Sequence, residues 1–374
     1  MSFDLPGRGL VFWPVANGDS TTVVVDSETH LQVDVNHLER SEDDDDRTWP
    51  VIDELVERLP KRDGRPYLNA FALTHPDQDH CREFPRLLEE VEIGELWFTP
   101  RVFREYKKDL CDDAKAFKEE AERRVKETIA AQGDPGAGSR VRIFGYSELL
   151  EEEPFKNFPA DRLTVPGSEL TTIDEEDVSD KFRAFVHAPF KDDDAGDRND
   201  TSLGMQVTLH DGTGKLQALL LGDLSYPIIE RIFRVSEDDD LAWNVLLAPH
   251  HCSKAVMYWK DESDDEEELK ERIVDEIGAA SRSPNRVVSS SNTVPSSNKD
   301  GDNPPHAKAK TQYESITTSF LCTMDNDDPV VAELEGEEIS FVGAAAASVS
   351  ASEAASRARG SSAPPGDAAT YGRG

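Results

Sequence analysis

Four side chains that can bind metal ions or transfer protons lie within six residues of the sequence. In the segment ALTHPDQDHCREF, residues 72–84, they are His75, Asp77, Asp79 and His80. Imidazole and carboxylate groups at this spacing fit an acid/base site, a single-metal site or a calcium-like loop. A run of polar residues directly after an apolar strand is difficult to explain by packing, so we expect a chemical site here.

Two other apolar segments end on residues of the same kinds. Asp223 follows QALLLG, and His250 and His251 follow NVLLAP. Because sites in α/β proteins usually lie at the carboxyl ends of strands, we expect the three segments to meet. Imidazole and carboxylate suit zinc, manganese or iron, and two ions need about five to seven such ligands. We therefore predict one or two ions, Zn²⁺ or Mn²⁺. The candidate metal ligands are His75, Asp77, Asp79, His80, Asp223, His250 and His251.

The composition restricts what such a site can act on. The chain has 374 residues, with 76 acidic and 41 basic side chains and a formal net charge of -35. This charge repels polyanions, so nucleic acid would bind only at a local basic patch or through metal ions. The sequence has no run of about 18 apolar residues and no signal-peptide pattern, which predicts a soluble cytoplasmic protein without a membrane partner. Its four cysteines form no CxxC pair, which argues against a disulfide scaffold or zinc ribbon.

The elements that must position these residues alternate between strands and helices. Short β-branched runs such as STTVVV open the chain, and strand signals return in KFRAFVHA, MQVTLH and LQALLL. Helix formers predict a helical excursion at about 102–135, and a charged run predicts a solvated acidic helix at about 260–278. The predicted strands form two groups along the chain, each with helices between its strands. This pattern indicates one layered α/β domain over residues 1–342. The small-residue-rich segment 343–374 predicts a disordered tail.

Several motifs resemble one known superfamily. THPDQDH, followed by LLLGD and APHH, resembles the metallo-β-lactamase superfamily, and more closely the ComEC-type hydrolases, which carry a THxDxDH variant of the HxHxDH motif. VANGDSTTVVVDS with LQVDVN resembles their opening GQGDA hairpin and DxG strand end. RNDTSLGMQV resembles their Asn-Ser-Leu strand, and NPPH their closing segment. The resemblance spans about residues 10–320 and implies a four-layer αββα metallo-β-lactamase sandwich with a helical insertion.

The resemblance also implies roles for the candidate residues. It assigns two ligand pairs and one bridge, namely His75 with Asp77, Asp79 with His80, and Asp223 between the ions. The last ligand would be His250 or else His251. Residues that would orient the ligands or contact substrate are Asp19, Asp34, Asn199, Ser202 and Asn292. No histidine clearly matches the middle ligand motif of the wider superfamily, and we expect His187, which is near the right place, to be a core residue.

The chain departs from the family pattern at two cysteines. Cys81 stands where a glycine pair usually follows the first motif, and Cys252 stands where the last motif is usually HHGS. Both directly follow a candidate ligand histidine. If both lie near the ions, they are thiolate ligands or an oxidisable pair; otherwise they serve as small buried residues.

The chemistry that the resemblance implies is hydrolysis by a metal-bound hydroxide, because a bound ion lowers the pKa of water from 15.7 to about 7. Asp77 or Asp79 would act catalytically by accepting a proton. The nuclease-like relatives and the oxygen-rich ligand set favour a phosphodiesterase or nuclease that acts on a small nucleotide or single-stranded nucleic acid. Alternatives are hydrolysis of an ester, thioester or peptide-like bond, and a non-catalytic scaffold with a decayed metal site.

A local basic cluster is the best candidate for contact with nucleic acid. It consists of Arg101, Arg104, Lys107 and Lys108. A solvated helix face explains these charges more readily, and contact with nucleic acid is the alternative. The sequence does not identify a protein partner.

Overall fold

Two mixed β-sheets form the centre of the molecule. The computed structural model describes residues 3–43, 45–104, 110–191, 198–261, 265–298 and 303–343. The first sheet has the strand order β22-β21-β1-β2-β3-β6-β7-β8-β9, with β5 beside β6. Its strands are β1 (Gly9–Phe12), β2 (Thr21–Val24), β3 (His30–Val33), β5 (Lys61–Arg62), β6 (Arg65–Leu73), β7 (Glu92–Phe98), β8 (Arg140–Phe144), β9 (Leu163–Thr164), β21 (Val330–Glu335) and β22 (Glu338–Val342). Pairing is antiparallel from β22 to β3 and parallel from β3 to β9.

The second sheet has the order β10-β13-β14-β15-β16-β19-β20. Its strands are β10 (Glu169–Leu170), β13 (Phe182–Ala188), β14 (Gly204–His210), β15 (Lys215–Leu220), β16 (Trp243–Leu247), β19 (Ser281–Ser289) and β20 (Phe320–Cys322). Pairing is antiparallel from β10 to β15 and parallel from β15 to β20. Each sheet therefore has a parallel part, whose strands all have their carboxyl ends at the same edge.

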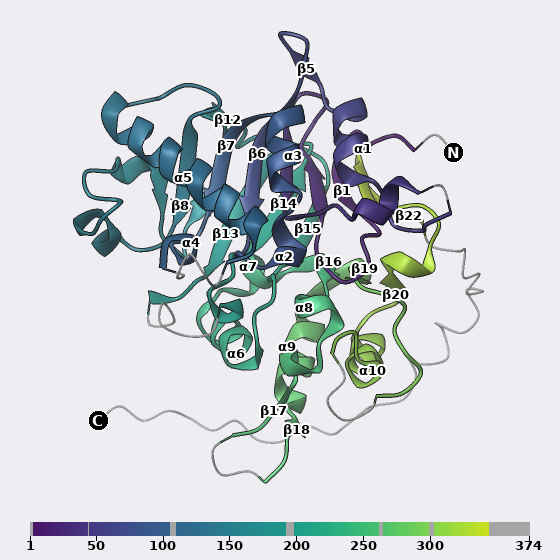
Figure 1. Ribbon diagram of the computed structural model, residues 1–374. Coiled ribbons are helices and arrows are strands. Elements are labelled where there is room, and N and C mark those ends of the chain that lie inside the picture. The colour runs from purple at the N-terminus through teal and green to yellow at the C-terminus, as the bar shows by residue number, and fades with distance from the viewer. Residues whose placement is uncertain are drawn as a thin grey trace, which may run out of the picture. The chain divides into compact units, whose positions relative to one another are not determined.

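Helices cover the outer face of each sheet. Those on the first sheet are α1 (Val51–Arg58), α3 (Phe84–Glu90) and α5 (Asp112–Ala131), and those on the second are α6 (Tyr226–Val235), α9 (Glu271–Ala279) and α10 (Ala307–Ile316). Figure 1 shows α1, α3 and α5 in front of the first sheet and strands of the second sheet behind it. Short helices lie at strand ends: α2 (Gln78–Cys81), α4 (Arg101–Arg104), α7 (Asp238–Leu241) and α8 (Pro249–Cys252).

The short remaining elements are a strand, β4 (Val35–Asn36), two small hairpins and several single turns of 3₁₀ helix. The hairpins are β11 (Thr172–Ile173) with β12 (Glu176–Asp177), and β17 (Tyr258–Trp259) with β18 (Glu268–Leu269). The 3₁₀ turns are η1 (Glu39–Glu42), η3 (Ser147–Glu151), η4 (Ala160–Arg162), η6 (Asn199–Thr201), η7 (Lys254–Val256) and η8 (Thr323–Asp325).

The central strands are buried on both faces. In β6 every residue after Arg65 is buried, and in β16 all residues are buried. Strands with this pattern must be covered by another layer on each side. Helices supply one layer for each sheet, and the other sheet supplies the second. The αββα sandwich that the sequence predicts is therefore confirmed.

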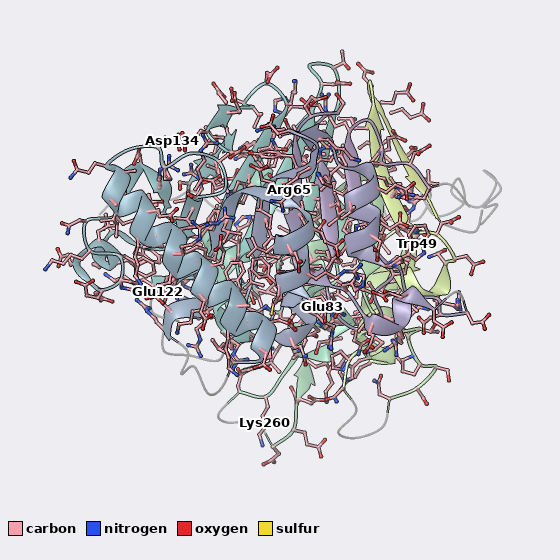
Figure 2. The ribbon with its side chains drawn as sticks, turned by 45° about the horizontal axis from the view of Figure 1, so that its top comes forward. Trp49, Arg65, Glu83, Glu122, Asp134 and Lys260 are labelled. Atoms are coloured by element: carbon pink, nitrogen blue, oxygen red, sulfur yellow. The ribbon has the colours of Figure 1, made fainter. Side chains whose placement is uncertain are left out.

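The long helix α5 is part of the outer helical layer. A helical excursion at about 102–135 was expected; α4 and α5 lie there, while residues 105–109 are outside the described part. The apolar face of α5 is buried against the first sheet through Phe117, Ala121 and Val125. Its outer face carries charged side chains such as Glu122, which Figure 2 labels. The helix therefore packs on the core rather than projecting from it, because its apolar residues recur at helical spacing.

We predict that Phe117→Ala lowers the free energy of unfolding by about 3–5 kcal/mol, since large-to-small changes in a core leave a cavity. The Phe117 ring is fully buried and lies 4.9 to 6.0 Å, between centroids, from the rings of Phe71, Phe84 and Phe98. Lys126→Ala on the exposed face of α5 is the control and should change stability by less than about 0.5 kcal/mol. Urea unfolding measures both, and equal effects would contradict the packing of α5.

The acidic segment differs from the expected helix at about 260–278. Within it lies the short strand β18, which pairs with β17, and the helix α9 begins only at Glu271, while residues 262–264 are outside the described part. Figure 2 shows Lys260, at the end of β17, projecting away from the sheets. The buried apolar residues of this segment, Ile273, Val274 and Ile277, all lie within α9. The described residues directly before α9, 265–270, are mostly charged and offer no apolar face for a helix to pack against the core.

The described residues up to Gly343 belong to one compact unit. The tail expected at 343–374 lies beyond Gly343, outside the described residues, as do Lys107 and Lys108 of the basic cluster. Among the described residues, no helix has the length and apolar character needed to cross a membrane.

Candidate metal centre

The carboxyl ends of strands from both sheets meet at one edge of the sandwich. The backbone NH of Leu203, just before β14, donates to the carbonyl of Thr74 at the end of β6, at 3.0 Å. The NH of His250 after β16 donates to the carbonyl of Gly222 after β15, also at 3.0 Å. These bonds bring together the three segments that carry the candidate ligands, as the sequence predicts.

A glycine allows a fourth segment to approach this edge. The NH of Asp19 donates to the carbonyl of Asp79 at 3.1 Å. At Gly18, with φ of +137°, a Cβ would lie 2.6 Å from the same carbonyl oxygen and 2.2 Å from Nδ2 of Asn36. A side chain cannot fit there, so the glycine permits the loop to place Asp19 beside the site.

Asp223 is the centre of the cluster. Its Oδ1 lies 3.4 Å from Nε2 of His80, and its Oδ2 lies 3.8 Å from Nε2 of His75. The same Oδ2 lies 3.6 Å from Nε2 of His251 and 3.7 Å from Nε2 of His250. The two carboxylate oxygens therefore face different histidines, and a role for Asp223 as a bridge between two ions stays a prediction.

The residues present fit a metal ion. Four of the buried polar atoms that lack a hydrogen-bond partner lie in this cluster: Nε2 of His75, His80 and His251, and Oδ1 of Asp223. Leaving such atoms unpaired is costly, and native structures rarely do so without a reason. When a tetrahedral zinc ion binds two donor atoms, each at about 2.0–2.2 Å, the two donors lie roughly 3.3–3.6 Å from each other. The distances between the Asp223 oxygens and the histidine Nε2 atoms are close to this range. The donor atoms form overlapping groups that could hold ions, namely His75, His80 and Asp223; Asp79, His80 and His251; Asp19, Asp223 and His251; and Asp19, Asp34 and His80.

Hydrogen bonds fix which ring nitrogen of two histidines faces the centre. Nδ1 of His80 lies 2.8 Å from Oδ2 of Asp34 and donates to it. The hydroxyl of Thr74 donates to the same oxygen at 2.7 Å, so its own oxygen accepts from Nδ1 of His75 at 3.1 Å. Each ring therefore carries its shared proton on Nδ1 and turns Nε2 toward Asp223. A carboxylate behind a ligand histidine orients it in this way in metal sites.

His251 is held similarly, with unusual backbone conformation. Its Nδ1 lies 3.2 Å from the carbonyl of Ser290, to which it donates, and 3.4 Å from Oδ1 of Asp19. His250, His251 and Cys252 have φ of 50°, 52° and 65°. Left-handed backbone costs of order 1–3 kcal/mol at each non-glycine residue and is retained mainly at functional sites. Of the two candidate last ligands, His251 is the more buried, at 3% exposed against 27% for His250.

One side of the cluster is open to solvent. Asp77 and Asp79 are 29% and 36% exposed, whereas His75 and His80 are fully buried. Burial raises the pKa of Asp77, but the neighbouring His75 and Arg198 outweigh it and lower the pKa to about 2. For Asp79, burial is likewise outweighed by His251 and His80, which lower its pKa. Both carboxylates are therefore ionised at neutral pH and accessible to a substrate.

Protons compete with ions for the buried histidines. Burial lowers the pKa of His80, but Asp223 and Asp34 outweigh it and raise the pKa well above 6.5. Burial is similarly outweighed at His251, where Asp223 and Asp19 raise the pKa. Without metal, each ring therefore keeps an extra proton at neutral pH, on the nitrogen that would bind an ion.

We predict that Mn²⁺ or Zn²⁺ binding releases protons and strengthens as pH rises. Because the folded-state pKa values are raised, protonation weakens binding below them, and affinity should rise about tenfold per pH unit for each proton displaced. Calorimetry in buffers of different ionisation enthalpy measures the number released. Binding without proton release at pH 7 would contradict the proton-for-ion exchange.

Three other predicted site residues lie in loops around the cluster. Ser202 and Asn199 belong to one turn, where the Ser202 hydroxyl donates to the Asn199 carbonyl at 2.7 Å. Asn292 donates from its backbone NH to Oδ1 of Asn17 at 2.9 Å, and Asn17 Nδ2 donates to the carbonyl of Pro304 at 2.7 Å. These bonds hold loops from distant parts of the chain together. Contact with substrate stays a prediction for all three.

Cys81 and Cys252, the two cysteines that depart from the family pattern, have separate neighbours. Cys81 Sγ lies 4.0 Å from Sγ of Cys111, and Cys252 Sγ lies 4.0 Å from the carbonyl of His306. The two belong to different hydrophobic clusters, one on each sheet. The adjacent Cys81 thiol lowers the pKa of Cys111 to about 6, although burial opposes this shift. The structure therefore does not place Cys81 beside Cys252, so these two residues do not form an oxidisable pair.

His187 is a core histidine, as the sequence predicts. Its Nδ1 lies 2.9 Å from the Ser236 hydroxyl and its Nε2 lies 3.1 Å from the Asp240 carbonyl. Burial lowers the pKa of His187 to about 4, so the ring is neutral. Both ring nitrogens have partners, which leaves none for an ion.

A second group of potential ligands already contains a cation. His37, Glu42 and Asp53 lie close enough to share an ion. The guanidinium of Arg86 lies among them, 2.9 Å from His37 Nε2 and 2.7 Å from each carboxylate. The arginine supplies the positive charge there, so this group is a structural ion-pair network.

Three residues of the centre were missed in the sequence. Thr74 links His75 to Asp34, Ser290 orients His251, and Arg198 pairs with Asp77. Thr74 stands directly before His75 in the motif, and Arg198 directly before Asn199, so both were adjacent to recognised residues. Nothing in the sequence distinguishes Ser290, because its role depends on a backbone carbonyl.

Comparisons with known proteins give only structural likenesses. No protein-family model matches the chain, and no curated protein matches it in sequence. Similar solved structures include the metallo-β-lactamase fold protein YhfI from Bacillus subtilis, at 10% identity and a TM-score of 0.39, covering 89% of this chain and 99% of that one. Unliganded yeast PDE1 has 9% identity and a TM-score of 0.39, covering 84% and 97%. Zn²⁺-bound PqqB from Methylobacterium extorquens has 16% identity and a TM-score of 0.27, covering 61% and 58%. At these values the likenesses carry no argument, and the ComEC-type relation stays a prediction.

Proposed function

We propose that this chain is a metal-dependent hydrolase of the metallo-β-lactamase superfamily that cleaves phosphodiesters. One observation carries the proposal: buried, unpartnered Nε2 atoms of three histidines converge on Asp223 at the joint edge of two sheets. Unpaired polar atoms in such a place are explained if they are ligands of a cation.

The residues that would hold one or two ions are those of the overlapping donor groups. They are His75, Asp79, His80, Asp223 and His251, with Asp77 and His250 at the solvent side. A divalent ion there supplies Lewis-acid chemistry that polarises the bond under attack and makes water more acidic. The mixed nitrogen and oxygen donors suit Zn²⁺ and Mn²⁺.

The protein side chains divide into a buried orienting set and an open reacting set. Asp34, Thr74 and Ser290 fix the ligand rings from behind. Asp77 and Asp79 face solvent and are ionised, so either is suited to accept a proton from an attacking water.

Arg198 supports a phosphodiester as the bond that is cleaved. Its guanidinium pairs with Asp77 on the open side of the centre and is itself 25% exposed. Guanidinium groups bind phosphate oxygens through charge-assisted hydrogen bonds. In a molecule with a net charge of -35, a cation at this place offsets the repulsion of an anionic substrate. A small nucleotide or a single-stranded end fits this local site better than a duplex that lies across the acidic surface.

A substrate panel tests the proposal. The full-length protein, loaded with Mn²⁺ or Zn²⁺, is offered bis-p-nitrophenyl phosphate, cyclic dinucleotides, single-stranded DNA and a thioester. We expect turnover of the phosphodiesters, and its loss in a His75→Ala, Asp79→Ala double variant. Turnover of the thioester alone would show hydrolysis of a different bond. Less than about 0.2 ion bound per chain would instead indicate a scaffold with a decayed site.

We predict that Arg198→Gln raises KM for bis-p-nitrophenyl phosphate about tenfold or more, since one charge-assisted hydrogen bond is worth about 1.5–3 kcal/mol. Metal content should stay unchanged, and Arg198→Lys should retain part of the affinity. Arg183→Gln is a matched control. Arg183, in β13, also pairs with a carboxylate, that of Asp240 in α7. A loss of metal with unchanged KM per loaded site would show that Arg198 only positions Asp77.

A further inference from the structure

Two cysteines from different elements lie side by side next to the candidate metal centre. Cys81 is the last residue of α2 and directly follows His80, and Cys111 precedes the first residue of α5. Both are free thiols, with Sγ atoms 4.0 Å apart. Cys81 is fully buried, whereas Cys111 is partly exposed. The pair therefore offers one thiol to solvent and a second thiol behind it.

The surroundings of the two sulfur atoms differ in a way that suits sequential reaction. Cys111 Sγ accepts a hydrogen bond from the NH of Ala114 at 3.4 Å, in the first turn of the 20-residue helix α5. Helix N-termini favour the thiolate, which is the reactive form of cysteine. Cys81 Sγ instead donates to the carbonyl of Asp77 at 3.2 Å. Cys111 is thus the attacking residue and Cys81 the resolving one.

We propose that Cys81 and Cys111 form an oxidative modification site that closes to a disulfide on reaction with a hydroperoxide. The thiolate of Cys111 attacks one peroxide oxygen, the O–O bond breaks, and a sulfenic acid forms while the other oxygen leaves and takes up a proton as water or an alcohol. The sulfur of Cys81 then attacks the sulfenic sulfur, and the S–O bond breaks. The departing hydroxide takes the proton of Cys81 and leaves as water. The two thiols lose two electrons, which reduce the peroxide.

Closure of the pair would disturb the metal-binding loop. The sulfur atoms must approach from 4.0 Å to about 2.05 Å, so Cys81 gives up its hydrogen bond to Asp77. The backbone of Cys81 also bridges that of Val35, the neighbour of Asp34. Oxidation therefore acts on the segments that hold His80, and we expect it to weaken metal binding. This consequence rests on the proposed function, whereas disulfide formation itself does not.

The first experiment tests the disulfide on the full-length, metal-free protein. Treatment with one equivalent of hydrogen peroxide should remove two of the four titratable thiols, measured after denaturation, and dithiothreitol should restore them. Peptide mapping should show a Cys81–Cys111 cross-link. Cys322→Ser, a buried cysteine on the second sheet, is the matched control and should still form it. In Cys81→Ser, dimedone should label Cys111. A cross-link between Cys252 and Cys322, or equal thiol loss in Cys111→Ser, would overturn the proposal.

The second experiment tests the effect on the metal centre. Mn²⁺ affinity is measured by calorimetry before oxidation, after it, and after reduction. We expect at least about a tenfold loss that dithiothreitol reverses and that Cys111→Ser does not show, since changes behind metal ligands typically cost 10–100-fold in affinity. A disulfide that leaves Mn²⁺ affinity unchanged would contradict the coupling. Failure of the reduced protein to bind Mn²⁺ or Zn²⁺ would instead refute the proposed function and leave the disulfide result standing.

Discussion

Replacing Asp223 by asparagine is expected to reduce bound metal to below about 0.2 ion per chain and hydrolysis by about 10³-fold or more, which corresponds to about 4 kcal/mol. The two oxygens of Asp223 face the Nε2 atoms of His75, His80 and His251 at 3.4 to 3.8 Å. An amide keeps the shape but loses the negative charge and replaces one oxygen by an NH₂ group, which cannot bind an ion.

The same substitution should change the histidines of the metal-free protein. Asp223 is the largest of the charges that raise the pKa of His80 and of His251. Without it, burial should pull both pKa values down, and NMR titration of the ring signals measures this shift. Asp238→Asn, at an exposed aspartate of α7, is the control and should retain full metal content. Wild-type metal content in Asp223→Asn would show that the ions bind elsewhere.

Asp34→Asn is expected to weaken metal binding about 10–100-fold without removing any direct ligand. The buried Asp34 carboxylate accepts from the Thr74 backbone NH, the Thr74 hydroxyl and His80 Nδ1, at 2.7 to 2.8 Å. An asparagine Nδ2 at this place would point hydrogens at two donors. His80 would then shift its proton from Nδ1 to Nε2 and could no longer offer that nitrogen to an ion.

The folded state should also lose about 3 kcal/mol in Asp34→Asn, since breaking a buried charged pair leaves groups without partners. Metal affinity by calorimetry and stability by urea unfolding separate the two effects. Thr74→Val removes only the hydroxyl that orients His75, so it should give a smaller loss of affinity in the same direction. Asp53→Asn, at a partly exposed carboxylate of α1, is the control. Unchanged affinity in Asp34→Asn would contradict an orienting role.

The sequence by itself determined the kind of site and where it lies in the fold. HPDQDH, Asp223 and the pair His250 and His251 each follow an apolar strand, and this order depends only on neighbouring residues. Burial of β6, β15 and β16 and the αββα layers follow from the same local patterns. Local propensity and periodicity are properties of short segments, so such features can be predicted from the sequence.

The tertiary structure decided how these residues act on one another. Thr74 joins the end of β6 to Asp34 after β3, Arg198 reaches Asp77 from the loop before β14, and Cys111 rather than Cys252 lies beside Cys81. Each of these contacts joins segments far apart in the chain and depends on strand order, register and helix packing. Local sequence patterns leave those long-range pairings open, whereas burial of both sheets fixes them.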